Sequence, residues 1–197
     1  MSKDKKQIAN FLFEVGMLAN TPRSGFYFLG SGKQSVAEHI NRVCYIGYVL
    51  AMMEKDVDTG RIVQMCLFHD MLESRISDLN YVHQKYTARF EDKAGKDLCD
   101  NLPFGKEVEE LLKEYHDRKT KESVLAKDAD NIELLLSVKE QFDIGNTRAQ
   151  EWLPSIAKRI KSKSAKQLIE AILETESDEW WFTDKDSKWW IDRDNQE

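Results

Sequence analysis

The sequence predicts an all-α fold: a single helical domain over residues 1–176 and a C-terminal tail over residues 177–197. Apolar residues recur at intervals of three and four along most of the chain, which is the spacing of one helix face. Only three prolines interrupt the 197 residues, and no run alternates apolar and polar residues as a half-buried strand does. A chain of this length can form one domain with a sizeable core.

The first predicted helix spans about residues 5–19 and ends before a proline-containing segment. Its apolar stripe contains Ile8, Phe11, Leu12, Val15 and Leu18. The following segment, Asn-Thr-Pro-Arg-Ser-Gly over residues 20–25, breaks the helical pattern. A glycine-containing loop is then expected to continue to about Gln34.

A capping box marks the start of the second helix, which we expect to reach about Glu54. Ser35 and Glu38 stand three positions apart, so the serine hydroxyl can accept from the Glu38 amide while the carboxylate accepts from the Ser35 amide. His39 falls in the first turns of this helix. Its inward side is expected to contain Val43, Ile46, Val49 and Leu50.

The third helix is expected over residues 59–74, where Ile62, Cys66 and His69 recur at intervals of three or four. This spacing points His69 toward the interior together with the apolar stripe. The remaining periodic segments predict helices over about residues 86–100, 106–117, 120–142, 147–162 and 164–175.

Cysteine usage and hydropathy predict a cytoplasmic protein with no membrane partner. Cys44, Cys66 and Cys99 are odd in number, far apart and without a Cys-x-x-Cys pair, as is typical of reduced thiols. No apolar run approaches the roughly 20 residues that cross a bilayer. The N-terminal segment also lacks the continuous apolar stretch of a secretory signal.

The formal charge of −6 is carried by the C-terminal segment from Glu174 onward, which includes the tail. From Glu174 to Glu197 there are nine acidic residues and three basic ones, so the preceding body is about neutral. A neutral body has no basic excess for binding long nucleic acid. Four of the five tryptophans also lie in this tail, and we expect these side chains to pack on the domain or on a second subunit.

Two histidines and two aspartates form a candidate metal site. Its members are His39, His69, Asp70 and Asp130. Imidazole and carboxylate ligands together suit a mid-series divalent ion, and four ligands leave octahedral positions open for water and substrate. A lone histidine on an apolar helix face is more often part of the core. Asp70, however, follows His69 directly with no evident basic partner, a costly arrangement near the core unless the carboxylate binds a cation.

Three further acidic residues lie close to these ligands in the sequence. Asp128 and Asp130 project about 200° apart on one helix, so only one can face the site. We choose Asp130 and expect Asp128 to face solvent. Glu73 follows His69 by four positions and would share its helix face, where it could orient or deprotonate a water; the alternative is a solvated helix-end acid. Asp78 could reach a leaving group, or could be an N-cap or turn residue.

An ordered set of motifs around this constellation resembles the HD-domain phosphohydrolases, and more narrowly the branch of 5′-deoxynucleotidases and HD-domain-containing protein 2. The bare His-Asp pair is common and unspecific, whereas the ordered set is specific. The similarity runs over about residues 11–136. The matching elements are Thr21-Pro-Arg23-Ser-Gly25, Ser35-Val-Ala-Glu-His39, His69-Asp70-Met-Leu-Glu73, Asp78 and Lys127-Asp-Ala-Asp130.

The resemblance implies a helical bundle of the HD-domain type that holds one divalent ion, commonly cobalt, manganese or magnesium. It also implies a homodimer and a (deoxy)ribonucleoside 5′-monophosphate as substrate. The ligands that it implies are His39, His69, Asp70 and Asp130.

The resemblance also implies roles around the ion. Arg23 would contact the phosphate, and Glu73 and Asp78 would act in catalysis or in substrate positioning. Lys33 and Lys127 are further candidates for phosphate contact, with the alternative that each is a surface lysine.

One position departs from the bacterial nucleotidase pattern. That enzyme has an aromatic residue directly after the arginine, where it helps to favour deoxyribose, whereas Ser24 follows Arg23 here. The segment Arg23-Ser24-Gly25-Phe26 is closer to the Arg-Thr-Gly-Trp of the eukaryotic relative. The choice between deoxyribose and ribose is therefore left open.

Three other functions are consistent with parts of the pattern. A deoxynucleoside triphosphate triphosphohydrolase would need several more cationic groups than Arg23 around the pocket, so a monophosphate substrate is preferred. A non-catalytic metal- or nucleotide-binding module would need neither Glu73 nor Asp78. A helical scaffold with histidines in its core would not change its thermal stability with metal or chelator.

Overall fold

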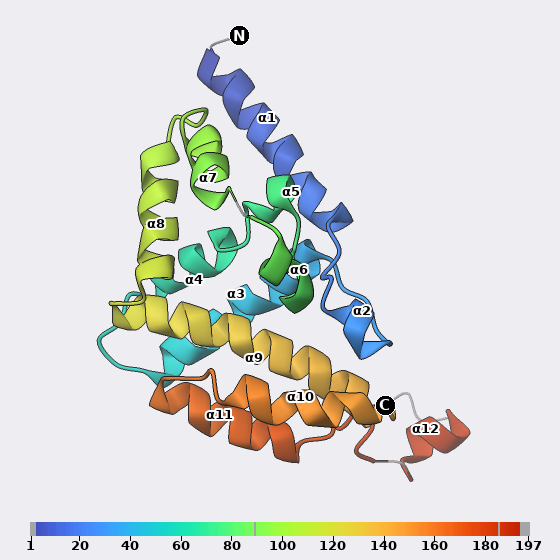
Figure 1. Cartoon of the computed structure of the whole chain (residues 1–197). Helices are drawn as coiled ribbons and strands as arrows, with labels where there is room; N and C mark the ends of the chain where they lie inside the picture. The colour runs from blue at the N-terminus through green and yellow to red at the C-terminus, as the bar shows by residue number, and fades with distance from the viewer. Residues whose placement is uncertain (1–2, 89, 185, 194–197) are drawn as a thin grey trace.

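The computed structural model describes residues 3–88, 90–184 and 186–193, and within these ranges every regular element is a helix (Figure 1). The all-α prediction is confirmed. In chain order the elements are α1 (Lys3–Met17), η1 (Leu18–Asn20), α2 (Phe26–Leu29), α3 (Val36–Met53), α4 (Thr59–Phe68), α5 (Glu73–Ile76), α6 (Tyr81–Tyr86), α7 (Glu91–Cys99), α8 (Gly105–Asp117), α9 (Lys121–Asp143), α10 (Thr147–Ala157), α11 (Lys163–Glu174) and α12 (Lys188–Asp192).

The long helix α9 is the centre of the fold. It crosses the middle of the molecule, with α10 and α11 along one side and α3 and α4 on the other (Figure 1). Its apolar side chains Leu125, Ile132 and Leu135 are buried in the main core. Because neighbours cover it on several sides, α9 buries residues around most of its circumference rather than along one stripe.

The start of α3 agrees with the capping-box prediction. The Ser35 hydroxyl accepts from the Glu38 amide at 3.2 Å, and the Glu38 carboxylate accepts from the Ser35 amide at 2.6 Å. The inward side of α3 was only partly predicted: Val43 and Leu50 are buried, but Val49 is 43% exposed. A residue adjacent to Leu50 is rotated by about 100° around the helix axis, which turns Val49 toward solvent.

The predicted helix over residues 59–74 is wrong beyond Phe68. The chain leaves α4 in tight turns, in which the amides of Met71 and Glu73 donate to the carbonyls of Phe68 and Asp70 at 3.0 Å. A short helix, α5, then begins at Glu73. His69 and Glu73 therefore do not share one helix face.

The structure differs from the predicted helices at three other places. The expected helix over residues 86–100 is replaced by α6, which Asn80 caps, and by α7, which begins at Glu91. The short helix α2 was not predicted, because four residues show no measurable periodicity. Helix α10 ends at Ala157 rather than near residue 162.

Asp128 does not face solvent, so that prediction is wrong. Its side chain is 1% exposed, and its two carboxylate oxygens accept from the amides of Lys161 and Ser162 at 2.9 and 2.7 Å. Because α10 and α11 cover this side of α9, Asp128 and Asp130 can both be withdrawn from solvent while pointing in different directions. Asp128 thereby attaches the α10–α11 connection to α9.

The start of the tail is attached to α9, whereas Trp180 and Trp181 remain open to solvent. The amide of Ser177 donates to Asp143 of α9 at 2.9 Å, and Lys139, which pairs with Asp143 at 2.6 Å, donates to the carbonyl of Thr175 just before the tail at 2.9 Å. Trp180 and Trp181 are 85% and 55% exposed. These two side chains are not covered by the described helices, and packing against a second subunit stays a prediction; the side chain of Trp189 lies outside the described residues.

Cys44, Cys66 and Cys99 are free thiols. Among the described residues, no helix combines the length and the apolar character that crossing a membrane requires.

Candidate metal centre and substrate cleft

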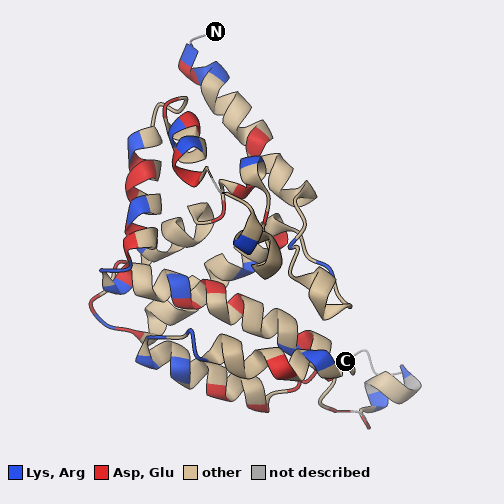
Figure 2. Ribbon diagram, viewed as in Figure 1, with Lys and Arg blue, Asp and Glu red and all other residues tan. Residues whose placement is uncertain are grey.

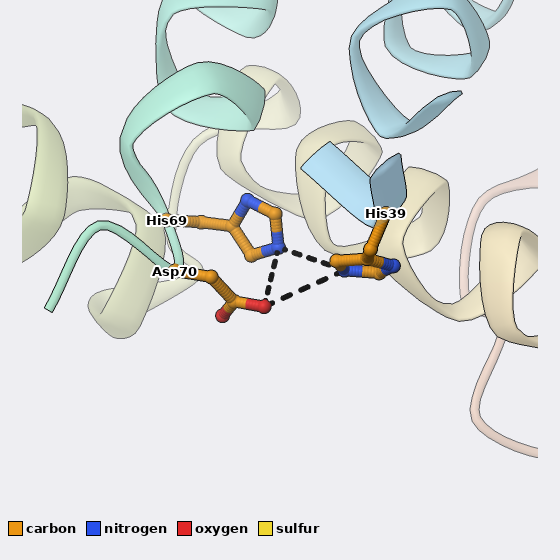
Figure 3. A group of neighbouring side chains, drawn as sticks. All are labelled: His39, His69 and Asp70. Atoms are coloured by element: carbon orange, nitrogen blue, oxygen red, sulfur yellow. Dashed lines mark hydrogen bonds and ion pairs between the residues drawn. The ribbon is translucent and has the colours of Figure 1, made fainter. Parts of the chain in front are cut away.

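The four predicted ligands converge from three helical segments. His39 comes from the first turns of α3, His69 and Asp70 directly follow α4, and Asp130 lies on α9. Nε2 of His39 lies 3.3 Å from Nε2 of His69, 3.5 Å from Oδ2 of Asp70 and 3.3 Å from Oδ1 of Asp130 (His39, His69 and Asp70 in Figure 3). Nε2 of His69 lies 3.3 Å from Oδ2 of Asp70 and 4.0 Å from Oδ1 of Asp130.

The second nitrogen of each imidazole is occupied by an acceptor outside the site. Nδ1 of His39 lies 2.5 Å from Oε2 of Glu133, and Nδ1 of His69 lies 2.7 Å from the carbonyl oxygen of Cys66. Both rings are therefore oriented with Nε2 toward the shared space. Ligands about 2.1 Å from one ion in neighbouring positions stand about 3 Å apart. The ligand atoms of His39, His69 and Asp70 all lie within 4.8 Å of one another, so these three residues fit a divalent cation, and Asp130 approaches the group on the side of His39.

The electrostatics of the site favour a bound positive charge. Burial opposes ionisation of Asp70 and Asp130, but His69 beside Asp70 and Lys127 beside Asp130 hold the pKa of each carboxyl below its usual range. Burial and Arg23 act to lower the pKa of His39, but hydrogen bonds to neighbouring carboxylates outweigh them and raise it to about 9. A divalent cation can take the place of that proton.

Asp70 has a basic partner, contrary to our expectation. Nη1 of Arg23 lies 3.0 Å from Oδ2 of Asp70 and 3.8 Å from Oδ1 of Asp78. The arginine approaches from the loop before α2, a segment too distant in sequence for spacing to reveal. Asp78 also fixes this loop, since it accepts from the Ser24 amide at 2.6 Å and its carbonyl accepts from the Ser24 hydroxyl at 2.7 Å.

Glu73 lines the same cleft as Arg23 and the aspartates. Its Oε2 atom is buried and has no hydrogen-bond partner among the described residues. Burial and the carboxylates of Asp70 and Asp78 raise the pKa of Glu73 to about 10. In the metal-free protein this carboxyl group is therefore protonated at neutral pH and can donate a proton.

The structure brings one of the two candidate lysines to the cleft. Nζ of Lys127 lies 2.6 Å from Oδ2 of Asp130 and 3.1 Å from the hydroxyl of Tyr115, which itself donates to Asp130 at 3.0 Å. Lys33 is exposed in the loop before α3 and does not line the clefts at this site. We therefore do not assign Lys33 to phosphate binding.

Glu133 was missed by the sequence reasoning although it contacts a ligand directly. Its side chain is fully buried, and its second oxygen accepts from Gln34 at 2.6 Å, Arg42 at 2.8 Å and Ser137 at 2.9 Å. Glu133 follows Asp130 by three positions and so lies on the same face of α9. That spacing could have identified it.

Two adjoining clefts meet at Arg23 and Asp78. The polar cleft, of about 640 Å³, contains Glu73, Asp70, Asp130 and Lys127. The apolar cleft, of about 530 Å³, shares Arg23 and Asp78 with it. Its walls include the apolar side chains Phe26, Leu29, Tyr81, Leu134 and Trp152. The polar cleft can accommodate a phosphate group, and the apolar cleft beside it can accommodate an apolar ring system.

An all-α domain in which two histidines and an aspartate bring their ligand atoms within 4.8 Å of one another, beside a second aspartate, an arginine and a buried glutamate, has the architecture of a helical metal-dependent hydrolase. The relatives of the chain refine that class.

The HD domain family matches residues 15–173. The 5′-deoxynucleotidase HDDC2 of Mus musculus is 30% identical over 179 residues, which cover 86% of this chain and 87% of the mouse protein. The 5′-deoxynucleotidase HDDC2 of Dictyostelium discoideum is 33% identical over 149 residues, covering 68% of this chain and 78% of that protein. A conserved hypothetical protein from Pyrococcus furiosus is structurally similar, with a TM-score of 0.71, 28% identity and coverage of 85% of this chain and 99% of that chain.

The chain belongs to the HD-domain family. The predicted resemblance is confirmed.

Proposed function

We propose that this protein is a metal-dependent phosphohydrolase that releases phosphate from (deoxy)ribonucleoside 5′-monophosphates. The observation that carries the proposal is the convergence of His39, His69, Asp70 and Asp130 beside Arg23. The printed activity of the HDDC2 relatives supports the choice of substrate.

The donor set is proposed to hold one divalent ion, with manganese or cobalt preferred to magnesium because two of the four ligands are imidazoles. When bound, this ion supplies Lewis acidity to the phosphoryl group and to the attacking water. The ligands are His39, His69, Asp70 and Asp130.

Arg23 is proposed to bind the non-bridging oxygens of the phosphate. Phosphoryl transfer spreads negative charge over these oxygens, and a guanidinium group can donate two parallel hydrogen bonds to them. The Arg23 side chain is oriented by Asp70 and Asp78, and the loop that carries it is attached through Ser24 to Asp78. Lys127, in contact with Asp130, adds a second positive charge to the polar cleft.

Glu73 is proposed to donate a proton to the departing 5′-oxygen of the nucleoside. In the metal-free protein, burial and the carboxylates of Asp70 and Asp78 favour the protonated form of this carboxyl group, which is the form that a proton donor to the leaving oxygen needs. Asp78 borders both clefts, where the bond between phosphorus and the 5′-oxygen would lie. We propose that Asp78 acts mainly by positioning Arg23 next to this bond.

The apolar cleft is proposed to bind the nucleoside. Phe26, Tyr81 and Trp152 offer aromatic faces on which a base can stack, and Asn80 and Gln84 add polar groups at the same wall. The Ser24 hydroxyl is already bonded to the carbonyl of Asp78 and is buried, so it does not select between ribose and deoxyribose.

We also propose that the protein forms a homodimer through the groove between α1, α3 and α4. In the single chain, α1 has no buried residue although it carries an apolar stripe. The groove has a volume of about 940 Å³ and is lined by exposed apolar side chains that include Leu12, Tyr45, Tyr48 and Leu67. Helix α1 lies at the edge of the molecule, away from α9, α10 and α11 (Figure 1), so a second copy can approach it.

The activity is tested by measuring phosphate release from deoxyadenosine, deoxyguanosine, thymidine and deoxyuridine monophosphates with manganese or cobalt. The control is the double variant His69→Ala, Asp70→Ala, which lacks two of the proposed ligands. Release that depends on metal and is lost in the control is expected. Wild-type release no greater than that of the control would exclude the proposed activity.

A further inference from the structure

The outer wall of the polar cleft carries four basic side chains that the proposed reaction does not use. They are Arg118, Lys158, Arg159 and Lys161. Arg118 directly follows α8, and the other three lie at the connection between α10 and α11, where lysine and arginine (blue) also mark the ribbon in Figure 2. Segments distant in sequence therefore bring positive charge to one side of the same cleft.

These four basic side chains lack the carboxylate partners that Arg23 and Lys127 have, within the part of the chain that the structure describes. Arg23 is paired with Asp70, and Lys127 is paired with Asp130. Within the part of the chain that the structure describes, no carboxylate lies within ion-pair distance of Arg118, Lys158, Arg159 or Lys161. Like charges gathered at one wall raise the local positive potential, and an anion entering the cleft relieves their repulsion.

The connection that carries three of the four cations is held in place on two sides. Asp128, itself 1% exposed, accepts from the backbone amides of Lys161 and Ser162 at 2.9 and 2.7 Å. Ile160, between the basic residues, is buried in the main core. The exposed side chains of Lys158, Arg159 and Lys161 therefore leave a fixed backbone, so little ordering of the chain is needed when they bind a ligand.

The position of the wall indicates which anion it can bind. Arg118, Lys158 and Lys161 line only the polar cleft, not the apolar cleft assigned to the nucleoside, whereas Arg159 lines both clefts. A group on the far side of the scissile phosphate from the nucleoside would meet them. The polar cleft has a volume of about 640 Å³. One phosphate group occupies only a few times the roughly 30 Å³ of a water molecule, so the cleft is larger than one phosphate group requires.

We propose that this wall is a second phosphate subsite, which binds a phosphate group linked to the one held at Arg23, as in a nucleoside 5′-diphosphate. The proposal rests on the proposed function, because that function places the first phosphate at Arg23. The four basic side chains of the wall are the additional cationic groups that a substrate or inhibitor with more than one phosphate requires. Binding of such a nucleotide would compete with the monophosphate for the same cleft.

The direct test compares the binding of inorganic pyrophosphate and orthophosphate by calorimetry. The manganese-loaded protein is used, with free manganese held constant and both anions titrated in its presence. The wild-type protein is expected to bind pyrophosphate at least about tenfold more tightly than orthophosphate, since each added charge-assisted contact contributes to affinity. Equal affinities for the two anions would overturn the proposal.

Two double variants separate the subsite from a general effect of charge. Lys158→Ala with Lys161→Ala removes two side chains of the wall but keeps the amide that Asp128 binds. Lys163→Ala with Lys166→Ala removes the same charge from exposed positions of α11 outside the cleft. The preference for pyrophosphate is expected to fall below about threefold in the first variant and to persist in the second. A preference that survives in the first variant would contradict the proposal.

The nucleotide form of the ligand is tested in the same preparations. Deoxyadenosine diphosphate is expected to inhibit monophosphate hydrolysis more strongly in the wild-type protein than in the Lys158→Ala, Lys161→Ala variant; equal inhibition would contradict the proposal. Hydrolysis without a preference for pyrophosphate would overturn the subsite alone. A preference for pyrophosphate without any hydrolysis would overturn the proposed activity and support the subsite as a binding site.

Discussion

Oε2 of Glu133 lies 2.5 Å from Nδ1 of His39, and both side chains are completely buried. The contact orients the imidazole so that Nε2 faces Asp70 and Asp130. Burial opposes ionisation of Glu133, but His39 and Arg42 outweigh it and lower the pKa of Glu133 to about 2. A buried carboxylate outside the candidate ligand group thus positions one of its members.

Glu133→Gln is expected to weaken manganese binding by about 10- to 100-fold, because the replacement keeps the shape but removes the charge that orients and polarises His39. Calorimetric titration of the metal measures the effect. Glu140→Gln is the matched control, since Glu140 also pairs with Arg42 but does not contact His39. Unchanged metal affinity in Glu133→Gln would show that this contact has no positioning role.

Glu73→Gln is expected to lower kcat by about 10²- to 10⁴-fold, because the amide cannot transfer a proton to the leaving oxygen. KM for the nucleotide should change little, since the replacement preserves size. Steady-state kinetics with saturating manganese measure both constants. A variant that keeps wild-type kcat would remove Glu73 from the proposed mechanism.

Glu73→Gln is also expected to stabilise the metal-free protein, prepared with a chelator, and the stabilisation is expected to grow as the pH rises. Glu73 has a pKa of about 10 when folded, against an ordinary value of 4.5. The folded state therefore holds a proton that the unfolded state loses above pH 4.5, and folding becomes less favourable between pH 4.5 and 10. Urea unfolding should show equal stability near pH 5 and an advantage for Glu73→Gln of at least about 1 kcal/mol at pH 8.5. A pH-independent difference would contradict this assignment.

Asp128→Ala is expected to lower the free energy of unfolding by about 1–3 kcal/mol, because two buried backbone amides lose their acceptor. Denaturant titration measures the change. Asp117→Ala serves as comparison, since Asp117 forms an exposed pair with Lys113 and should change the free energy of unfolding far less. Equal effects of the two substitutions would mean that Asp128 does not anchor the α10–α11 connection.

The proposed homodimer is tested by light scattering coupled to size-exclusion chromatography. Leu12→Glu combined with Tyr48→Glu places two charges in the groove between α1 and α3, and is expected to convert a dimer into a monomer because burying an unpaired charge is costly. Ile144→Glu adds a charge at an exposed apolar position outside the groove and should leave the dimer intact. A monomeric wild-type protein would refute the proposal.

The sequence by itself determined the helices whose signals are local. The Ser35–Glu38 capping box begins α3 as predicted. The helix predicted over about residues 120–142 is present as one uninterrupted helix, α9. The same local reasoning failed where short turns follow α4, because four residues carry too little periodicity to separate a turn from a continuing helix.

The residue types at the candidate metal centre were also identified from the sequence, whereas their surroundings were decided by tertiary structure. The contact between Arg23 and Asp70 joins residues 47 positions apart, and that between His39 and Glu133 joins residues 94 apart. Asp128 was assigned to solvent because helix geometry alone cannot show that α10 and α11 cover its side of α9. Capping and periodicity act within a few residues, but packing brings distant charges together, and only packing decides which carboxylates bind a backbone, which bind a cation and which cations face the cleft.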